Sequence, residues 1–291
     1  MKSKLAALCT YMKGKVAVDT LDEYTYISTE NMIPNKGGIE RASSLPSTQY
    51  TQAFDLGDVL VSNIRPYFKK IWMAEYSGGC SNDVLVFRAS KGCDPTFLYY
   101  VLANNSFFDY ATATSKGTKM PRGDKTAIMQ YEVPAFDIAT QQRIGRLLKG
   151  IDTRIVTNKK INDNLAELLQ TVYQERFGDV SAATEQGMLS DICSYSRDRV
   201  AVSELNASTY FSTENMLPGK AGATEAASLP TIPQTTACHK GDTLISNIRP
   251  YFKKIVYCED RCGCSTDVLC FTPVQPKYAA YLFSTLYADK F

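Results

Sequence analysis

The chain has 291 residues, 44% of them hydrophobic, and its 32 basic and 30 acidic residues leave a formal net charge of +2. This length and apolar fraction predict about two globular domains with buried cores, and they exclude a disordered or strongly polybasic protein. Charge is spread evenly, since residues 1–136 hold 15 basic and 13 acidic groups and residues 180–291 hold 10 and 11. Contact with nucleic acid would therefore depend on a local patch of positive charge.

A long internal repeat dominates the sequence. Residues 62–71 and 246–255 are the same ten letters, SNIRPYFKKI, and Val16–Phe87 aligns without a gap to Val200–Phe271 with 41 of 72 positions identical. Solenoid repeats have much shorter periods, so the pattern indicates a duplicated domain. Two copies of one domain favour a partner with two similar halves, such as a bipartite DNA site.

The N-terminal residues belong to this repeat. The apolar run in MKSKLAALC is too short for a signal peptide, and its LAALC aligns with LSDIC at Leu189–Cys193. No apolar run is long enough to predict a membrane-spanning helix. Four of the nine cysteines, all in the second copy, stand where the first copy has Phe, Ala, Gly or Val, which is typical of small buried side chains. We expect a reduced, cytoplasmic protein without a membrane partner.

Each copy is predicted to begin with strands and to continue into a helix. Asp94-Pro95 has the N-cap and first-turn residues of a helix that we expect to run to about Tyr110. Its counterpart is expected to begin at Pro276 after a three-residue deletion, so that Phe291 corresponds to about Tyr110 and the second copy is incomplete. The proline of IRPY predicts a bend or a sheet edge. The expected strands are short and rich in β-branched or aromatic residues: Val59–Val61, Lys70–Ala74 and Val84–Phe87.

Residues 138–177 predict one long helix of about 60 Å, at 1.5 Å per residue. Apolar residues alternate at spacings of four and three, which is the pattern of a coiled-coil seam. Two asparagines interrupt the seam, as polar residues that fix register do. The seam residues that we expect to pack on a partner are Ile144, Leu148, Ile151, Ile155, Asn158, Asn162, Leu165 and Leu169.

Catalytic and metal-binding patterns are missing from the sequence. The single histidine, His239, faces Asp55 in the other copy, and neither a P-loop nor a GxGxxG loop occurs. A zinc site around Cys258, Cys262 and Cys264 is the alternative, but the first copy lacks those cysteines apart from the counterpart of Cys264. We expect no catalytic residue, no cofactor and no metal.

Two groups of residues are candidates for DNA contact, because Lys and Arg hold phosphates by charge and hydrogen bonds. The first is the basic cluster of the repeated decapeptide, for which a solvated hairpin is the alternative: Arg65, Lys69, Lys70 and their counterparts Arg249, Lys253 and Lys254. The second is the loop Ser115–Arg122, which could also be an ordinary surface loop: Lys116, Thr118, Lys119 and Arg122. The repeated STENM offers an asparagine to adenine, or it forms a polar turn.

The order of the motifs along the chain resembles that of a known family. A segment with STENM, GDVLVSNIRPYFKK and GTKMPR is followed by VPAFDIATQQRIGRLLKGIDTRIVTNKKINDNLAELLQTVYQERF and by a second such segment. This resembles the specificity (S) subunit of type I restriction–modification systems, C-terminally truncated. The resemblance implies that each recognition domain reads one half of a split DNA site, and that the helix acts as a ruler and docks methyltransferase subunits. A complete member has two such helices packed antiparallel.

The expected fold is α/β (α+β), with two homologous target-recognition domains joined by a long coiled-coil-type helix. The expected boundaries are 1–136, 137–179 and 180–291. The expected partners are double-stranded DNA, methyltransferase subunits, indirectly the restriction subunit, and a second copy through the long helix. Two alternatives stay open: the recognition portion of a fused type II restriction–methylation enzyme, and a coiled-coil scaffold without a DNA role.

Overall fold

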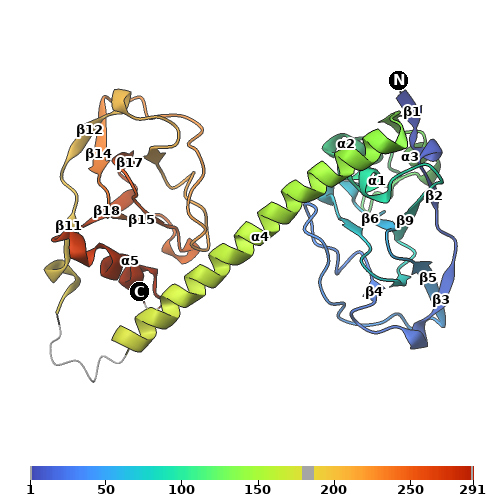
Figure 1. The fold of residues 1–291 in the computed structure, drawn as a ribbon, viewed down its shortest axis with the longest axis horizontal. Helices are drawn as coiled ribbons and strands as arrows, with labels where there is room; N and C mark the ends of the chain where they lie inside the picture. Colours follow the sequence, from blue (N-terminus) through green and yellow to red (C-terminus); the bar gives the residue numbers. More distant parts are fainter. Residues whose placement is uncertain (1, 179–186, 290) are drawn as a thin grey trace. The chain divides into compact units, whose positions relative to one another are not determined.

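The computed structural model describes residues 2–178, 187–289 and 291 (Figure 1). The chain divides into two compact units, Met1–Asn158 and Lys159–Phe291, which we call unit 1 and unit 2. The division falls inside one long helix, α4 (Ile138–Phe177). Among the described residues, no helix combines the length and the apolar character needed to cross a membrane.

Unit 1 contains two four-stranded sheets and one two-stranded ladder. One sheet is antiparallel with the order β2-β9-β6-β7, and the other has the order β3-β5-β8-β4 with β4 parallel to β8. The ladder pairs β1 with β10. The strands are β1 (Lys2–Lys4), β2 (Cys9–Tyr11), β3 (Lys15–Ala17), β4 (Tyr26–Ile27), β5 (Tyr50–Phe54), β6 (Val59–Ser62), β7 (Ile71–Met73), β8 (Gly78–Cys80), β9 (Val84–Ala89) and β10 (Glu132–Pro134).

Strand β6 lies at the centre of the packing in unit 1. Side chains alternate across a strand, so Val59 and Val61 enter one apolar cluster while Leu60 enters the other. All three are almost fully buried. The first cluster packs the sheet against the helices, and the second fills the space between the two sheets. The three strands expected from the sequence are confirmed as β6, β7 and β9.

The helices of unit 1 differ from the expected single segment. Asp94 caps α1 as predicted, since its carboxylate accepts from the Phe97 N–H at 2.9 Å. The helix ends at Leu102, because Asn104 caps a second helix through the Ser106 N–H at 3.0 Å. The prediction of one helix to Tyr110 is therefore wrong: a local asparagine cap divides it. The helical segments are α1 (Pro95–Leu102), α2 (Asn105–Ala113), α3 (Lys125–Met129) and the 3-10 turns η1 (Leu5–Ala7), η2 (Val18–Thr20) and η3 (Pro66–Phe68).

Unit 2 repeats both four-stranded sheets, with the orders β11-β18-β15-β16 and β12-β14-β17-β13. Its strands are β11 (Cys193–Tyr195), β12 (Arg199–Ala201), β13 (Tyr210–Phe211), β14 (Gln234–Cys238), β15 (Thr243–Ser246), β16 (Ile255–Tyr257), β17 (Cys262–Cys264) and β18 (Val268–Pro273). Its helical segments besides α4 are η5 (Leu189–Asp191), η6 (Val202–Glu204), η7 (Pro250–Phe252), η8 (Pro276–Tyr278) and α5 (Ala279–Tyr287).

Helix α5 corrects the expected alignment of the two copies. Pro276 begins only the 3-10 turn η8, and α5 begins at Ala279, which is 184 residues after the first residue of α1 at Pro95. At the same offset, Leu282 and Leu286 occupy the core positions of Leu98 and Leu102. The alignment therefore continues without the three-residue deletion, and the extra turn replaces the loop before α1.

All nine cysteines are buried and free of disulfides. Five of them meet in one apolar cluster of unit 2, where the Cys258 and Cys262 sulfurs lie 3.5 Å apart. In unit 2 two of these cysteines replace a glycine and a phenylalanine of unit 1, so that the side-chain volume is divided differently between the two positions. A Cβ at Gly78 in unit 1 would lie 2.8 Å from the Phe54 ring, and in unit 2 those two positions are Cys262 and Cys238. In the described chain, no group of His, Cys, Asp or Glu has the arrangement of a metal site.

Helix α4 (Ile138–Phe177) confirms the predicted long helix. Its first turns pack on unit 1: Gln141 is buried and its amide oxygen accepts from the Asp94 N–H at 3.0 Å. Gly145 permits this approach, because a Cβ there would lie 3.1 Å from the Asp94 carboxylate. Its last turns pack on unit 2, where the Tyr173 hydroxyl bonds the Thr285 hydroxyl at 3.2 Å.

Candidate nucleic-acid interface

The decapeptide SNIRPYFKKI forms a sharp turn at the end of β6. Arg65 and Lys69 adopt positive φ angles of 50° and 53° on either side of η3. This conformation costs about 1–2 kcal/mol for a residue other than glycine. Hydrogen bonds across the turn offset the cost: the Phe68 N–H donates to the Arg65 carbonyl, and the Lys36 N–H donates to the Lys69 carbonyl at 2.9 Å. The turn is therefore a fixed platform.

The loop Ser115–Arg122 is a small hairpin docked on this platform. The Lys116 and Arg122 backbones exchange two hydrogen bonds of 2.9 Å, and Gly117 provides the reversal with a φ of 93°. The Arg65 N–H donates to the Pro121 carbonyl at 2.8 Å. The structure thus brings together the two groups of residues that the sequence singled out in unit 1.

Partners within unit 1 hold four of the predicted contact residues. The Lys70 ammonium donates to the Thr29 carbonyl at 2.6 Å, and Lys69 donates to the Asn105 side chain at 3.1 Å. Arg122 pairs with Asp83 at 3.0 Å. The fourth is Lys116, which pairs with Asp124 at 2.6 Å; the hydrogen bond raises the Lys116 pKa.

These four interactions differ in strength. Lys70 is half-buried and supports the STENM turn, so its charge is used within the fold. The Lys116 side chain is 81% exposed, and exposed ion pairs contribute only about 0–1 kcal/mol. Lys116 can therefore leave the carboxylate of Asp124 and pair with a phosphate instead. Thr118 and Lys119 are exposed at the hairpin tip, and their side chains have no partner among the described residues. The half-buried Arg65 has no partner for its guanidinium there either.

Unit 2 repeats the pattern with one change. Lys254 donates to the Thr213 carbonyl at 2.5 Å, as Lys70 does to Thr29. Lys253 pairs with Asp289 at 2.8 Å. Arg249 is exposed, because the described part of unit 2 has no hairpin like Ser115–Arg122 over the turn.

The STENM segment is a structural turn. The Asn31 side chain is buried, and its amide donates to the Tyr26 and Glu40 carbonyls at 3.1 and 2.9 Å. Its oxygen accepts from the Ser28 N–H at 2.6 Å, and Asn215 repeats these bonds in unit 2. This asparagine has no free edge for adenine, so the polar-turn interpretation is confirmed.

The predicted helix seam separates into a packed and an exposed part. Ile144 packs against the core of unit 1, and Leu148 and Leu169 are half-buried. The intervening seam is exposed, with Ile155 at 61% and Leu165 at 57%. The remaining seam residues Ile151, Asn158 and Asn162 are exposed as well.

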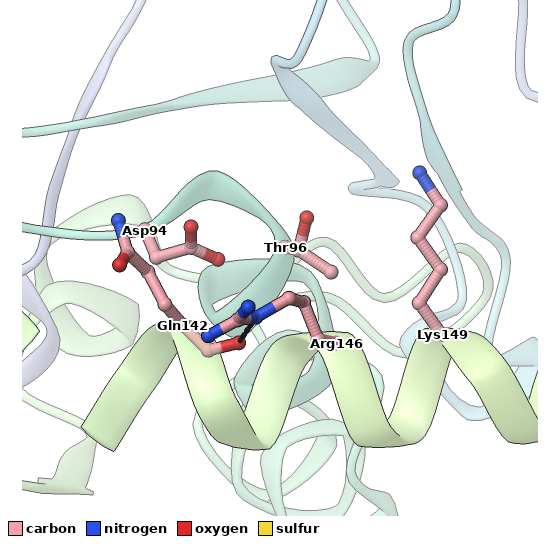
Figure 2. A pocket seen from close by; sticks show the side chains of 5 residues that line it. All are labelled: Asp94, Thr96, Gln142, Arg146 and Lys149. Atoms are coloured by element: carbon pink, nitrogen blue, oxygen red, sulfur yellow. Dashed lines mark hydrogen bonds between the residues drawn. The ribbon is translucent and has the colours of Figure 1, made fainter. Parts of the chain in front are cut away.

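Polar residues surround the place where α4 meets α1. A cavity of about 350 Å³ is lined by Asp94, Thr96, Gln142, Arg146 and Lys149. Figure 2 shows three of these side chains rising from α4 beside the start of α1. Nearby, Tyr100 donates to Asp152 at 2.7 Å, which fixes the helix further. Sequence periodicity did not reveal these residues, because they are polar and lie outside the seam.

Comparison with known proteins gives one family. A family model described as the type I restriction modification DNA specificity domain matches residues 4–167, more than half of the chain. The chain is 27% identical over 140 residues to the type I restriction enzyme EcoDI specificity subunit of Escherichia coli, which covers 46% of this chain but only 31% of that protein.

Solved structures show the same fold. The type I restriction–modification S subunit from M. genitalium matches with a TM-score of 0.61 and 16% identity, over 98% of this chain and 76% of that one. The HsdS subunit from Thermoanaerobacter tengcongensis matches at 0.43 and 17%, over 98% and 79%. The first likeness confirms the expected architecture of mixed sheets and helices with a long helix.

Proposed function

Because the chain belongs to the family of type I restriction–modification DNA specificity domains, we propose that it is a non-catalytic subunit that recognises a bipartite DNA sequence. Unit 1 would read one half-site and unit 2 the other. The repeated turn supports this, since Arg65 and Arg249 hold the same rare backbone conformation with φ angles of 50° and 51°. Two equivalent surfaces suit two similar halves of one duplex.

The hairpin Lys116–Arg122 would contact the DNA backbone in unit 1. The observation that carries the proposal is the placement of exposed Lys119, Thr118 and Lys116 on a hairpin that docks on the turn of Arg65. Hydrogen-bond donors and positive charges so arranged neutralise phosphates and position the protein on the duplex. Base reading would come from residues that differ between the units.

Helix α4 would carry the other subunits. Its exposed apolar residues between Ile151 and Leu168 must be covered by a partner, because a long helix gains its stability from packing. In this family's complexes the partners would be methyltransferase subunits and, through them, the restriction subunit. A second copy of α4 would pair along the same seam in the free protein. Such a role would be carried out in the cytoplasm.

A salt titration tests the proposal. The full chain should bind duplex DNA, and the logarithm of the binding constant should fall linearly with the logarithm of salt concentration, by about 0.9 per neutralised phosphate. Charge reversal of Lys116, Lys119 and Arg122 should weaken binding to all sequences and flatten this slope. If the slope is unchanged, the hairpin does not contact phosphates. If the chain binds no duplex DNA, the alternative of a coiled-coil scaffold without a DNA role is favoured.

A further inference from the structure

In each unit a second turn, which we call the tip turn, packs on the decapeptide turn. The tip turns are residues 34–37 and 218–221. In unit 1 the Asn35 N–H donates to the Phe68 carbonyl at 2.8 Å. In unit 2 the Gly219 N–H donates to the Phe252 carbonyl, also at 2.8 Å. The same backbone hydrogen bond therefore holds the tip turn on its decapeptide in both units.

The two tip turns also have the same backbone conformation. Asn35 and Lys36 have φ angles of 56° and 63°, and the equivalent Gly219 and Lys220 have φ angles of 68° and 62°. Glycine adopts this left-handed conformation without cost, and asparagine adopts it more readily than most other residues. The backbone is thus the same whether asparagine or glycine stands at the first of these positions.

The paired turns of the two units differ in sequence at only two positions. All ten residues of the decapeptide and two of the four residues of the tip turn are identical. One difference is Gly37, which is Ala221 in unit 2. A Cβ at Gly37 would lie 2.5 Å from Ile33 Cγ2, whereas unit 2 has Leu217 there, which is not branched at Cβ. This difference is therefore explained by packing.

The other difference is Asn35, which is Gly219 in unit 2. Asn35 is exposed, and its side-chain amide has no hydrogen-bond partner in the part of the chain that the structure describes. A Cβ at Gly219 would have no atom within 4 Å, so there is room for a side chain in unit 2 as well. The Asn35 amide is the one hydrogen-bonding side chain by which the paired turns differ.

We infer that Asn35 reads an adenine in the half-site of unit 1, and that unit 2 reads no base from the equivalent position. The inference rests on the proposed recognition of DNA. A side-chain amide offers both a donor and an acceptor, which match the N7 acceptor and the N6 amino donor of adenine in the major groove. The buried Asn31 lacks this freedom, because its amide is bonded within the fold.

The chemistry of the tip turn favours contact with a base over contact with a phosphate. Both tip turns already have a lysine next to this position, Lys36 and Lys220, which can hold a phosphate in either unit. A phosphate accepts hydrogen bonds only, so it would leave the amide oxygen of Asn35 without a donor. Adenine satisfies both groups of the amide.

Exchange of the two residues tests the inference. Duplexes are selected from a random library by the full chain, by Asn35→Gly, by Gly219→Asn and by the variant with both substitutions. Asn35→Gly should lose a preference for adenine at one position of one half-site. Gly219→Asn should gain it at the equivalent position of the other half-site, and the double variant should show the exchange. Titration with matched duplexes should show discrimination changed by about 5- to 150-fold. Each substitution places a residue that the other unit already holds at nearly the same φ angle.

The matched control exchanges Asp19 and Ser203, which are exposed, equivalent and different, and lie outside the paired turns. Asp19→Ser with Ser203→Asp should leave the selected motif unchanged. A bipartite motif that is the same in all variants would overturn the inference and leave the proposed function intact. Weaker binding of Asn35→Gly to all sequences alike would also overturn it, because that is the result of a phosphate contact. If the unchanged chain selects no motif, the proposed function fails and the inference fails with it.

Discussion

Lys70 and Lys119 illustrate two uses of the same side chain in one unit. Lys70 supports the Thr29 carbonyl from a half-buried position, whereas Lys119 is exposed at the tip of the hairpin. A hydrogen bond from a charged group contributes about 1.5–3 kcal/mol, whereas a phosphate contact contributes to the salt slope. The two lysines should therefore respond differently to the same substitution.

Lys70→Ala should lower the free energy of unfolding of unit 1 by about 1.5–3 kcal/mol and leave the salt slope of DNA binding unchanged. Lys119→Ala, with the same loss of charge, should leave stability unchanged and reduce the slope by about one. Denaturant unfolding followed by the fluorescence of Trp72, the single tryptophan, measures the first effect. A reversed pattern would show that Lys70 is the DNA contact.

The two units have an equivalent buried carboxylate, Asp58 and Asp242, with different partners. In unit 1, Arg88 donates to both oxygens of Asp58 at 2.8 and 2.7 Å. At the equivalent positions, unit 2 has Thr272 and Asp242. Asp242 accepts from the His239 N–H at 2.8 Å and from the Cys270 thiol, but its other oxygen has no partner in the described chain. Burial therefore raises the pKa of Asp242 from 3.8 to about 7.

The raised Asp242 pKa predicts that unit 2 loses stability as pH rises. Folded Asp242 keeps its proton up to about pH 7, whereas the unfolded chain releases it near 3.8. The free energy of unfolding should fall across this window by about 4 kcal/mol and then level off. Asp242→Asn should remove this loss, and Thr272→Arg should restore the ion pair of unit 1. Calorimetry from pH 4 to 8 measures both; an equal pH slope in Asp242→Asn would contradict the assignment.

Residue identity alone did not reveal these roles. Lys70 and Lys254 are identical in the two copies, which fits a DNA contact and a structural hydrogen bond equally well. Only the carbonyls of Thr29 and Thr213 decide between them, and both lie 41 residues away in sequence. Arg41 aligns with Glu225 of unit 2, pairs with Glu23 and stacks on Tyr24. Reading of a guanine by Arg41 would require this ion pair to break.

The sequence predicted those features of the helices that depend on residues close together in the chain. The Asp94-Pro95 cap identified the start of α1, and the heptad spacing of residues 138–177 identified the bounds of α4. The break at Asn104 was missed, because the apolar pattern continues through it while one asparagine cap divides the helix. The docking of α4 was also missed, because Gln141 and Gly145 act through a single partner residue, Asp94.

The exposed seam of α4 should mediate self-association. Ile155→Glu with Leu165→Glu should abolish concentration-dependent dimer formation, since a buried charge in a coiled-coil seam is strongly unfavourable. Lys160→Glu lies on the opposite face of the helix and should have no effect. Analytical ultracentrifugation distinguishes the variants, and a dimer that survives the seam substitutions would place the contact elsewhere.

The length of α4 should set the spacing of the half-sites. Four residues inserted near Asn158 add about 6 Å at 1.5 Å per residue, which corresponds to about two base pairs. Methylation mapping with complexes of the lengthened subunit should show a longer spacer and unchanged half-site bases. An unaltered spacer would mean that α4 is not the ruler.

For the molecule as a whole, most of the structure that could be predicted follows from the internal repeat of the sequence. It predicted the duplicated sheets and the common turn, because 41 identical positions in 72 preserve the same contacts. It could not predict that the hairpin Ser115–Arg122 docks on the turn of unit 1, since that depends on residues outside the aligned region. The shared surface also predicts related half-sites arranged as an imperfect inverted repeat, with differences traced to diverged positions such as Asn35/Gly219 and Asp55/His239.

We propose that unit 1 and unit 2 recognise two halves of one DNA sequence. Selection of duplexes from a random library by the full chain, followed by sequencing, tests this most directly. We expect an enriched motif of two half-sites with common bases, separated by a spacer of fixed length and random sequence. Enrichment of one undivided motif, or of none, would contradict it.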